Sequence, residues 1–234
     1  MHAYSQVKFP IAHLILEECS SFEVISKILP LDITENITHA KIEHSDTELE
    51  LPGKMTDIFP NIKKLEIYKL GQISVTTMTE DHKWPEKLEH LDLISIRNMT
   101  KLPNFNQSNI ISLDLNKCNN LDDISNVKFL PKLQNIILYK IKALEKLPPR
   151  IFQHNTALQK LVINNAKITN LEPETWKGLE NLRIFHLEKN PVKISNLPGF
   201  FKHCPKLQDI FWAPNYSCDL PRYFLTSGNT EVHR

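Results

Sequence analysis

The chain has 234 residues, of which 41% are hydrophobic and 24% charged, so it has the size and composition of one large folded domain. Its 28 basic and 27 acidic residues leave a formal net charge of +1, which provides no electrostatic attraction to nucleic acid or to a membrane surface. Five glycines against fifteen prolines argue against a glycine-rich phosphate-binding loop and indicate a chain divided by rigid turns.

A nine-position pattern that is apolar at positions one, four and six recurs along the whole chain. Positions four and six of a short strand point to the same side of a sheet, because side chains alternate between its faces. One copy cannot bury its apolar edge alone, whereas stacked copies form a sheet over a continuous core. The nine copies begin at Ile11, Ile37, Ile62, Leu88, Ile110, Leu133, Leu158, Leu182 and Leu207. The pattern predicts an α/β solenoid shaped like a horseshoe, with a parallel β-sheet on its concave side.

The segments between the predicted strands have no long apolar period of 3.6 residues, so we expect irregular or short 3₁₀ connections on the convex side. Apolar–proline pairs such as Phe59-Pro60 stand before several strands, where proline fixes φ and donates no hydrogen bond to a sheet. Phe152 and Trp176 each follow a proline in the return segments. We expect these two aromatic side chains to fill the convex side of the core.

The repeated pattern resembles the leucine-rich repeat, L-x-x-L-x-L-x-x-N, over nearly the whole chain. The stretch LPPRIFQHNTALQKLVINNAKITNL, within residues 133–218, resembles the extracellular animal class, which includes Toll-type receptor ectodomains and secreted arthropod proteins. NYSCDL, at residues 215–220, resembles a degraded start of the C-terminal cap of that class. LDLNKCNNLDDI instead resembles the Cys-type repeats of intracellular sensors. We therefore assign residues 1–217 to the solenoid and 218–234 to a degenerate cap or tail.

The resemblance implies a protein-recognition module that binds a protein ligand on its concave face, with no enzymatic activity and no cofactor. One interpretation is the ligand-binding ectodomain of a Toll-like receptor, or a secreted immune or developmental glycoprotein. The alternative is a cytoplasmic scaffold or sensor segment, for example a ubiquitin-ligase adaptor. We expect no nucleic-acid partner and no membrane insertion by this segment, and the oligomeric state stays open. The degraded repeats and cap lead us to expect a piece of a larger protein.

Position nine of the leucine-rich repeat normally carries an asparagine, whose side chain satisfies backbone groups in the turn after the strand. The predicted members of this structural ladder here are Cys19, Cys118, Asn190 and Asn215. The other repeats carry residues such as Ile96 and Ile141, which offer no side-chain hydrogen bond. We therefore expect irregular turns around Leu70, Ile96 and Ile141.

Position five lies at the centre of the concave face, and its character changes along the solenoid. In the first half it is mostly charged, with Glu66, Asp92 and Asp114, which we interpret as solvated. In the second half it is mostly apolar or aromatic, and Tyr139 lies nearby at position seven. Exposed apolar patches of this kind mark interaction sites. The predicted protein-binding residues are Ile137, Tyr139, Val162, His186 and Phe211.

The remaining candidates are single residues and short motifs. His13 and His39 occupy position three of adjacent repeats, where we expect surface side chains rather than a metal site. Cys204 and Cys218 are close in sequence, and whether they form a disulfide stays open. No catalytic motif and no metal-ligand spacing is present in the sequence. The predicted N-glycosylation sites are Asn36, Asn98 and Asn106.

Overall fold

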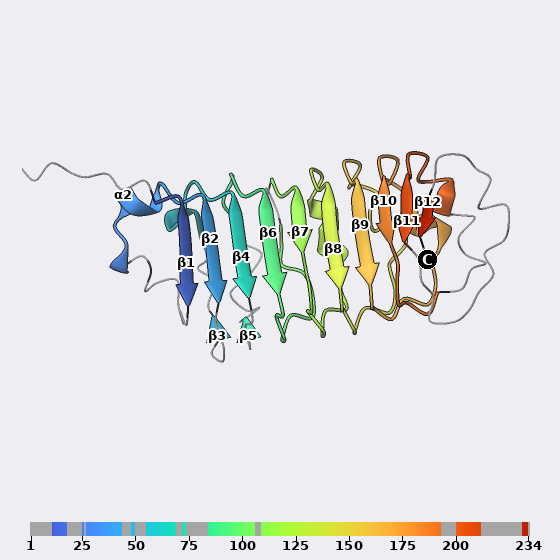
Figure 1. Ribbon diagram of the computed structural model, residues 1–234, viewed down its shortest axis with the longest axis horizontal. Coiled ribbons are helices and arrows are strands. Elements are labelled where there is room, and N and C mark those ends of the chain that lie inside the picture. Colours follow the sequence, from blue (N-terminus) through green and yellow to red (C-terminus); the bar gives the residue numbers. More distant parts are fainter. Residues whose placement is uncertain are drawn as a thin grey trace, which may run out of the picture.

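A computed structural model describes residues 11–17, 25, 27–43, 48–49, 55–68, 72–73, 84–105, 109–192, 200–211 and 231–233. Ten strands of this part of the chain form one parallel sheet, in the order β1-β2-β4-β6-β7-β8-β9-β10-β11-β12. The strands stand side by side along the long axis of the molecule and follow the chain from one end to the other (Figure 1). This is the solenoid that the repeat pattern predicts.

Each of the nine predicted repeats contributes one strand, and each strand begins at position three of its repeat. The nine strands are β1 (His13–Glu17), β2 (His39–Glu43), β4 (Lys64–Tyr68), β6 (His90–Ile94), β7 (Ser112–Asp114), β8 (Asn135–Tyr139), β9 (Lys160–Asn164), β10 (Ile184–His186) and β11 (Asp209–Phe211). Equivalent positions pair across neighbouring strands, as with Leu65 and Leu91. The register is therefore set by the repeat itself, because a slip of one residue would turn the apolar side chains out of the core.

The sheet contains one strand that the pattern does not predict. Residues Glu231–His233 form β12, which pairs in parallel with β11. This strand lies within the segment 218–234 that we assigned to a degenerate cap or tail. A second, two-stranded parallel sheet joins β3 (Glu48–Leu49) and β5 (Gln72–Ile73). It lies just beyond the ends of β2 and β4 (Figure 1).

The core lies behind the sheet and runs through the described length of the solenoid. Positions one, four and six are buried in repeats two to eight, and positions one and four are buried in repeat nine, whose position six lies outside the described residues. In the first repeat, Ile11 is 39% exposed and Leu14 and Leu16 are only partly buried. The first repeat is less well covered because β1 is the edge strand of the sheet and packs against a neighbour on one side. Elsewhere, each fully buried leucine or isoleucine contributes about 1.5–3 kcal/mol to stability.

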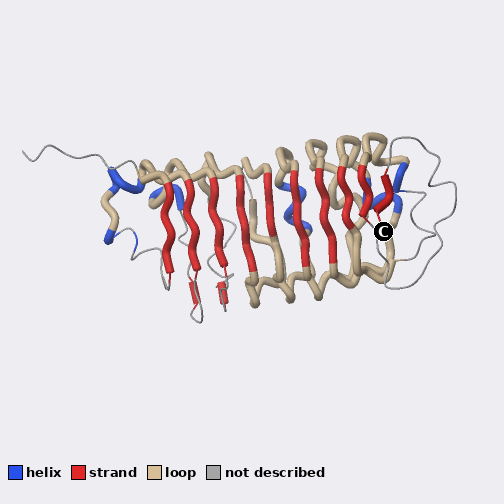
Figure 2. Tube along the Cα trace, in the orientation of Figure 1, coloured by secondary structure: helices blue, strands red, loops and turns tan. Residues whose placement is uncertain are grey.

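The return segments on the convex side are mostly turns, with short helices among the described residues (Figure 2). Four of these helices have both ends within the described part of the chain. These are α2 (Leu31–Thr34), η1 (Met55–Asp57), η3 (Ser125–Phe129) and η4 (Pro173–Trp176). Phe152 and Trp176 are fully buried, as predicted. The ring of Trp176 also contacts those of Phe185 and Phe200, at centroid distances of 5.5 and 4.9 Å. Aromatic side chains therefore fill the space between the sheet and the convex turns.

A row of Asn and Lys side chains, which the sequence analysis did not identify, links repeats just before position one. The lysine Nζ of one repeat donates to the asparagine Oδ1 of the repeat before it, at 2.6–2.7 Å. Each asparagine in turn donates from Nδ2 to a backbone carbonyl of its own preceding repeat. The pairs are Asn61 with Lys87, Asn109 with Lys132, and Asn181 with Lys206. The spacing of these residues, always one before an apolar position one, is the sequence signal that could have identified them.

Candidate protein-interaction surface

The residues at position five form one continuous row across the concave face. Strand pairing places Asp114 beside Ile137, then Val162, His186 and Phe211 in succession. Tyr139, two residues further along β8, pairs with Asn164 on β9. The structure thus brings the five predicted binding residues together on four adjacent strands. We call Ile137, Tyr139, Val162, His186 and Phe211 the aromatic patch below.

Four of the five patch residues are partly exposed, and one is not. Ile137, Tyr139, His186 and Phe211 are intermediate in exposure, whereas Val162 is only 7% exposed. We had expected Val162 to face solvent. Its short side chain stands between two longer ones on strands that lie about 4.8 Å away on either side, so little of it remains accessible. Val162 therefore supports the patch from beneath rather than offering contact area.

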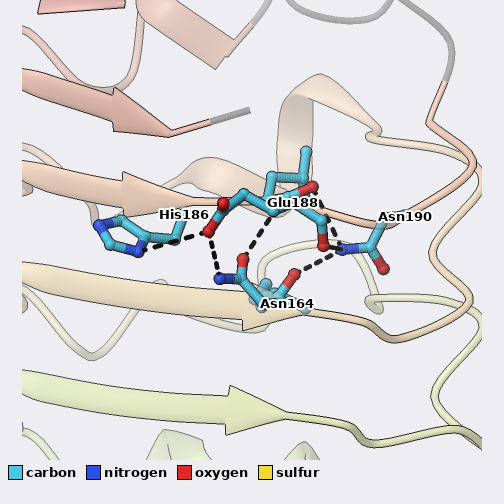
Figure 3. Close-up of polar contacts among 6 residues, drawn as sticks. Asn164, His186, Glu188 and Asn190 are labelled. Atoms are coloured by element: carbon cyan, nitrogen blue, oxygen red, sulfur yellow. Dashed lines mark hydrogen bonds and ion pairs between the residues drawn. The ribbon is translucent and has the colours of Figure 1, made fainter. Parts of the chain in front are cut away.

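His186 and Phe211 are in direct contact on neighbouring strands. Their ring centroids are 4.2 Å apart and the ring planes are tilted by 48°. His186 Nδ1 also lies 4.0 Å from Glu188 Oε2 (Figure 3). The imidazole thus packs against an aromatic ring and lies beside a carboxylate.

A polar network beside the patch fixes the carboxylate of Glu188. Asn164 donates from Nδ2 to Glu188 Oε2 at 2.6 Å and accepts from the Glu188 backbone N–H at 2.9 Å (Figure 3). Asn164 is only 9% exposed, whereas the Glu188 side chain is 37% exposed, so these hydrogen bonds are partly shielded from water. Asn164 and Glu188 both occupy position seven, and comparing that position between repeats would have paired them. This network pre-organises the C-terminal end of the aromatic patch.

Tyr139 lies at the other end of the patch and is contacted by a cation. Lys140 Nζ lies 5.2 Å from the centroid of the Tyr139 ring, within the range of a cation–π interaction. Such a contact at a partly exposed site stabilises the ring position by about 0.5–1 kcal/mol. Tyr139 therefore presents a partly ordered aromatic surface to solvent.

The acidic half of the row is more buried than we expected. Lys64 Nζ lies 2.8 Å from Glu66 Oε1 and 3.6 Å from Asp92 Oδ2, and the side chains of Glu66 and Asp92 are only 22% and 16% exposed. Asp114 accepts a hydrogen bond from the backbone N–H of Asn116 at 3.0 Å. The prediction of solvated carboxylates is therefore wrong, because three acidic side chains pack side by side on adjacent strands. We call Glu66, Asp92 and Asp114 the acidic row.

Burial and crowding shift the ionisation of the acidic row. Burial raises the pKa of Asp92 to about 6, and the negative charges of Asp114 and Glu66 act in the same direction. Burial also raises the pKa of Asp114. Burial is the largest single influence on Glu66 and opposes its ionisation, but the hydrogen bond and charge of Lys64, together with hydrogen bonds from Tyr68 and Asp92, lower the pKa of that carboxyl overall. The row thus carries negative charge that Lys64 does not fully balance.

His13 and His39 lie side by side on β1 and β2, as their shared position in adjacent repeats predicts. The rings of His13 and His39 are 4.5 Å apart, and Thr38 Oγ1 lies 2.9 Å from His39 Nδ1. Burial lowers the pKa of His39, and the neighbouring charge of His13 adds to this. Within the described residues, no three His, Cys, Asp or Glu side chains are arranged to hold a metal ion.

Comparison with known proteins identifies the repeat. A family model described as "Leucine rich repeat" matches residues 131–192. A leucine-rich-repeat protein of Leptospira interrogans superimposes with a TM-score of 0.64, covering 91% of this chain and 52% of that one at 18% identity. This chain has a leucine-rich-repeat fold. The fold is a scaffold for protein interaction rather than for catalysis.

Further comparisons match a Toll-like receptor in sequence and two solved leucine-rich-repeat structures in fold. Toll-like receptor 2 of Equus caballus is 27% identical over 174 residues, which are 73% of this chain and 21% of that protein. Toll, in the structure of the Drosophila Toll–Spatzle complex, superimposes with a TM-score of 0.55 at 15% identity, covering 87% of this chain and 27% of that one. An internalin of Listeria monocytogenes gives a TM-score of 0.51 at 14% identity, covering 86% and 54%. The chain spans about a fifth of the length of its curated relative. Among the described residues, no helix has the length and hydropathy needed to cross a membrane.

The position-nine residues that the structure describes are buried whether they are polar or not. Asn190 Nδ2 donates to the carbonyls of Ile163, Leu187 and Glu188 at 2.5–3.3 Å (Figure 3), and its Oδ1 accepts from the backbone N–H of Ile168. Cys118 Sγ donates to the carbonyl of Leu93 at 3.1 Å, which is the equivalent carbonyl one repeat back. Burial raises the pKa of the Cys118 thiol to about 12, so it remains protonated. Cys19 and Asn215 lie outside the described residues.

The turns after the strands are regular, so the prediction of irregular turns around Ile96 and Ile141 is wrong. Position eight has a left-handed backbone in five successive repeats, with φ between 56° and 64°. These residues are Ser95, Lys117, Lys140, Asn165 and Lys189. In the first four of them, the backbone N–H donates to the position-seven carbonyl of the next repeat, at 2.7–2.9 Å. This backbone ladder fixes the turn without an asparagine, while Ile96 and Ile141 stay fully buried. Leu70 lies outside the described residues.

The Asn190 side chain tests how much the remaining side-chain ladder contributes. We expect Asn190→Asp, which keeps the volume but replaces the amide donor with an acceptor, to lower the free energy of unfolding by about 2 kcal/mol. Urea denaturation at neutral pH measures this change. The matched control is Asn165→Asp, at an adjacent position whose backbone, not its side chain, forms the ladder. Equal losses in the two variants would contradict a specific role for the Asn190 amide.

The remaining predicted sites are cysteines and glycosylation sequons. Cys204 is 3% exposed and is a free thiol in the described part of the chain, and Cys218 lies outside the described residues. Asn36 and Asn98 are exposed, and Asn36 Nδ2 donates to the carbonyl of Asp32 at 2.6 Å. Asn106 lies outside the described residues. Both described sequons thus present their asparagine to solvent.

Proposed function

We propose that this chain is a protein-recognition module that binds a protein ligand through the aromatic patch on its concave face. The observation that carries the proposal is the contact of His186 with Phe211, which the Asn164–Glu188 network supports from one side. Aromatic side chains that are held in place before binding lose little conformational entropy when a partner is bound. The patch is therefore built like an interaction site rather than a solvated surface.

Alanine substitution of the two aromatic side chains at the ends of the patch tests this proposal. A phage-displayed random peptide library selected on the wild-type chain supplies the ligands. We expect Tyr139→Ala combined with Phe211→Ala to weaken binding of the selected peptides by more than about 2 kcal/mol, a factor of about 30 in Kd. The matched control is Phe129→Ala, an exposed aromatic residue on η3, away from the sheet. Unchanged affinity in the double variant would refute the assignment of the patch.

The receptor or secreted setting is the second part of the proposal. The likeness to Toll-like receptor 2 and to Toll in its Spatzle complex supports a ligand-binding ectodomain or a secreted immune protein. The exposed sequons at Asn36 and Asn98 support passage through the secretory pathway. Asn106 is the third proposed site of glycosylation.

Expression behind an added secretion leader tests the extracellular setting. We expect the secreted chain to lose mass on treatment with an N-glycosidase, because at least two sequons are accessible. Asn36→Gln combined with Asn98→Gln should remove most of that mass difference. A secreted wild-type chain without glycan would contradict the extracellular assignment.

A cytoplasmic scaffold or sensor segment is the second candidate. The observation that favours it is Cys118, whose thiol takes the ladder position as in the Cys-type repeats. Its raised pKa and burial make it unreactive, which suits a structural thiol in a reducing compartment. Failure of the leader-fused chain to leave the cell folded, together with stable cytoplasmic expression, would favour this candidate.

A further inference from the structure

We propose that the partner of this concave face presents a basic segment followed by an apolar one, which the acidic row and the aromatic patch bind together. This inference rests on the proposed function and specifies the chemistry of the partner. It commits to a protein ligand whose Arg or Lys side chains face Glu66, Asp92 and Asp114. Its apolar side chains face Ile137, Tyr139, His186 and Phe211.

The two surfaces are one continuous strip. Glu66, Asp92 and Asp114 are paired in register on β4, β6 and β7, and Asp114 is paired directly with Ile137 of the aromatic patch. Strands lie about 4.8 Å apart, so the four steps from Asp92 to His186 span about 19 Å. About six residues of an extended segment cover that distance. One short stretch of a partner chain can therefore reach both halves.

The cations that neighbour the acidic row do not balance its negative charge. Among the described residues, Lys64 is the cation within 4 Å of Glu66 and Asp92, and it contacts both carboxylates. The Tyr68 hydroxyl also donates to Glu66, at 3.2 Å, but brings no positive charge. The next lysine along the sheet, Lys41, is engaged by Glu43 at 3.0 Å. Burial of Asp92, together with the charge of Asp114, raises the pKa of its carboxyl, as expected where negative charges crowd a poorly solvated surface. A guanidinium or ammonium group from a partner would balance that charge.

The whole chain does not attract cations, so the attraction is local. The formal net charge is +1, and a basic peptide gains nothing from the protein as a whole. Lys117 and Lys189 at position eight are exposed beyond the ends of the strands, and Lys140 lies close to Tyr139. These lysines disfavour a basic segment along that edge of the sheet. Charge complementarity therefore directs a basic segment to the acidic row in the middle of the strands.

The probe is a synthetic peptide of three arginines, a Gly-Ser-Gly-Ser spacer and Trp-Leu-Phe, made in both chain directions. One control peptide has glutamates in place of the arginines, and another has only glycine and serine after the arginines. We expect calorimetry to show that at least one direction of the full peptide binds about tenfold more tightly than either control. We also expect binding to weaken as the salt concentration rises from about 50 to 300 mM, since exposed charges are then screened.

Variants of the chain separate this inference from the proposed function. We expect Asp92→Asn combined with Asp114→Asn to raise the Kd of the full peptide about tenfold. Glu145→Gln combined with Glu172→Gln makes the same change in net charge on exposed residues away from the strip and should have less than about a twofold effect.

The inference is overturned if the full peptide has a Kd above about 1 mM in both chain directions. It is also overturned if the glutamate peptide binds as tightly as the full peptide, or if the Asp92 and Asp114 variant binds the full peptide as tightly as wild type does. If the Tyr139 and Phe211 variant loses binding while the Asp92 and Asp114 variant keeps it, the claim of a basic segment in the partner is overturned but the proposed function stands. Loss in the aspartate variant with no effect of the aromatic one would overturn both. Circular dichroism and thermal denaturation of each variant show that any loss is not unfolding.

Discussion

Replacing Gly178 with alanine is expected to lower the free energy of unfolding by about 3 kcal/mol or more. Gly178 follows η4 and has φ of +95°, a conformation that residues with a Cβ rarely adopt. An added Cβ would lie 2.3 Å from the carbonyl oxygen of Phe152 and 2.7 Å from the Cα of Gln153. Both are backbone atoms of the preceding repeat, so rotation of a side chain cannot relieve the clash. The turns that carry Phe152 and Trp176 would have to separate and disturb the aromatic core.

Urea denaturation of Gly178→Ala, followed by circular dichroism, measures this loss. The matched control is Asn165→Ala, which places alanine at φ of 56° on the other side of the core. It tests the cost of a left-handed backbone alone, which we expect to be about 1 kcal/mol. If the two variants lost the same stability, the close approach of repeats at Gly178 would not be the cause.

The strands were predictable from the sequence because burial imposes a strict pattern on them. A strand that covers a core must alternate, so Leu113 and Leu115 on one repeat already specify which face is buried. Stacking then fixes the register, since equivalent positions of successive repeats face the same core. The repeat pattern did not predict β12, because Val232 is the one apolar residue among Glu231–His233. A strand that is added mainly by backbone pairing leaves little trace in the sequence.

The turns and the exposure of single residues were not predictable in the same way. The turn at Ile96 depends on backbone conformation and on a carbonyl of the next repeat, and neither is encoded by one side chain. The burial of Val162 and Asp92 depends on the size of side chains on neighbouring strands, which lie more than 20 residues away in sequence. Reading each position across repeats, rather than along the chain, is what reveals such contacts. The pairing of Asn164 with Glu188 is an example at position seven.

Replacing Asp92 with asparagine is expected to raise the free energy of unfolding at pH 7 by about 2–3 kcal/mol. The pKa of Asp92 is about 6 in the folded chain, against an ordinary value of 3.8, because burial and nearby carboxylates disfavour its charge. Each pKa unit corresponds to about 1.4 kcal/mol. Between pH 4 and 6 the folded chain holds a proton that the unfolded chain has lost, so stability falls as the pH rises through this range. Above pH 6 the full cost is present, and below pH 4 it is absent.

Urea denaturation of wild type and Asp92→Asn between about pH 3.5 and 7.5 should therefore give two curves that meet at low pH and separate as the pH rises. Glu145→Gln, at an exposed carboxylate, should leave the wild-type curve unchanged. An Asp92→Asn variant that is less stable than wild type at pH 7 would show that the Lys64 contact outweighs burial. The expected gain has a consequence for function. If the same substitution stabilises the chain and weakens binding of the arginine peptide, the Asp92 carboxylate destabilises the folded chain but contributes to binding. A bound partner then offsets that loss of stability. A gain in stability with unchanged peptide binding would instead leave Asp92 as a buried charge with no role in recognition.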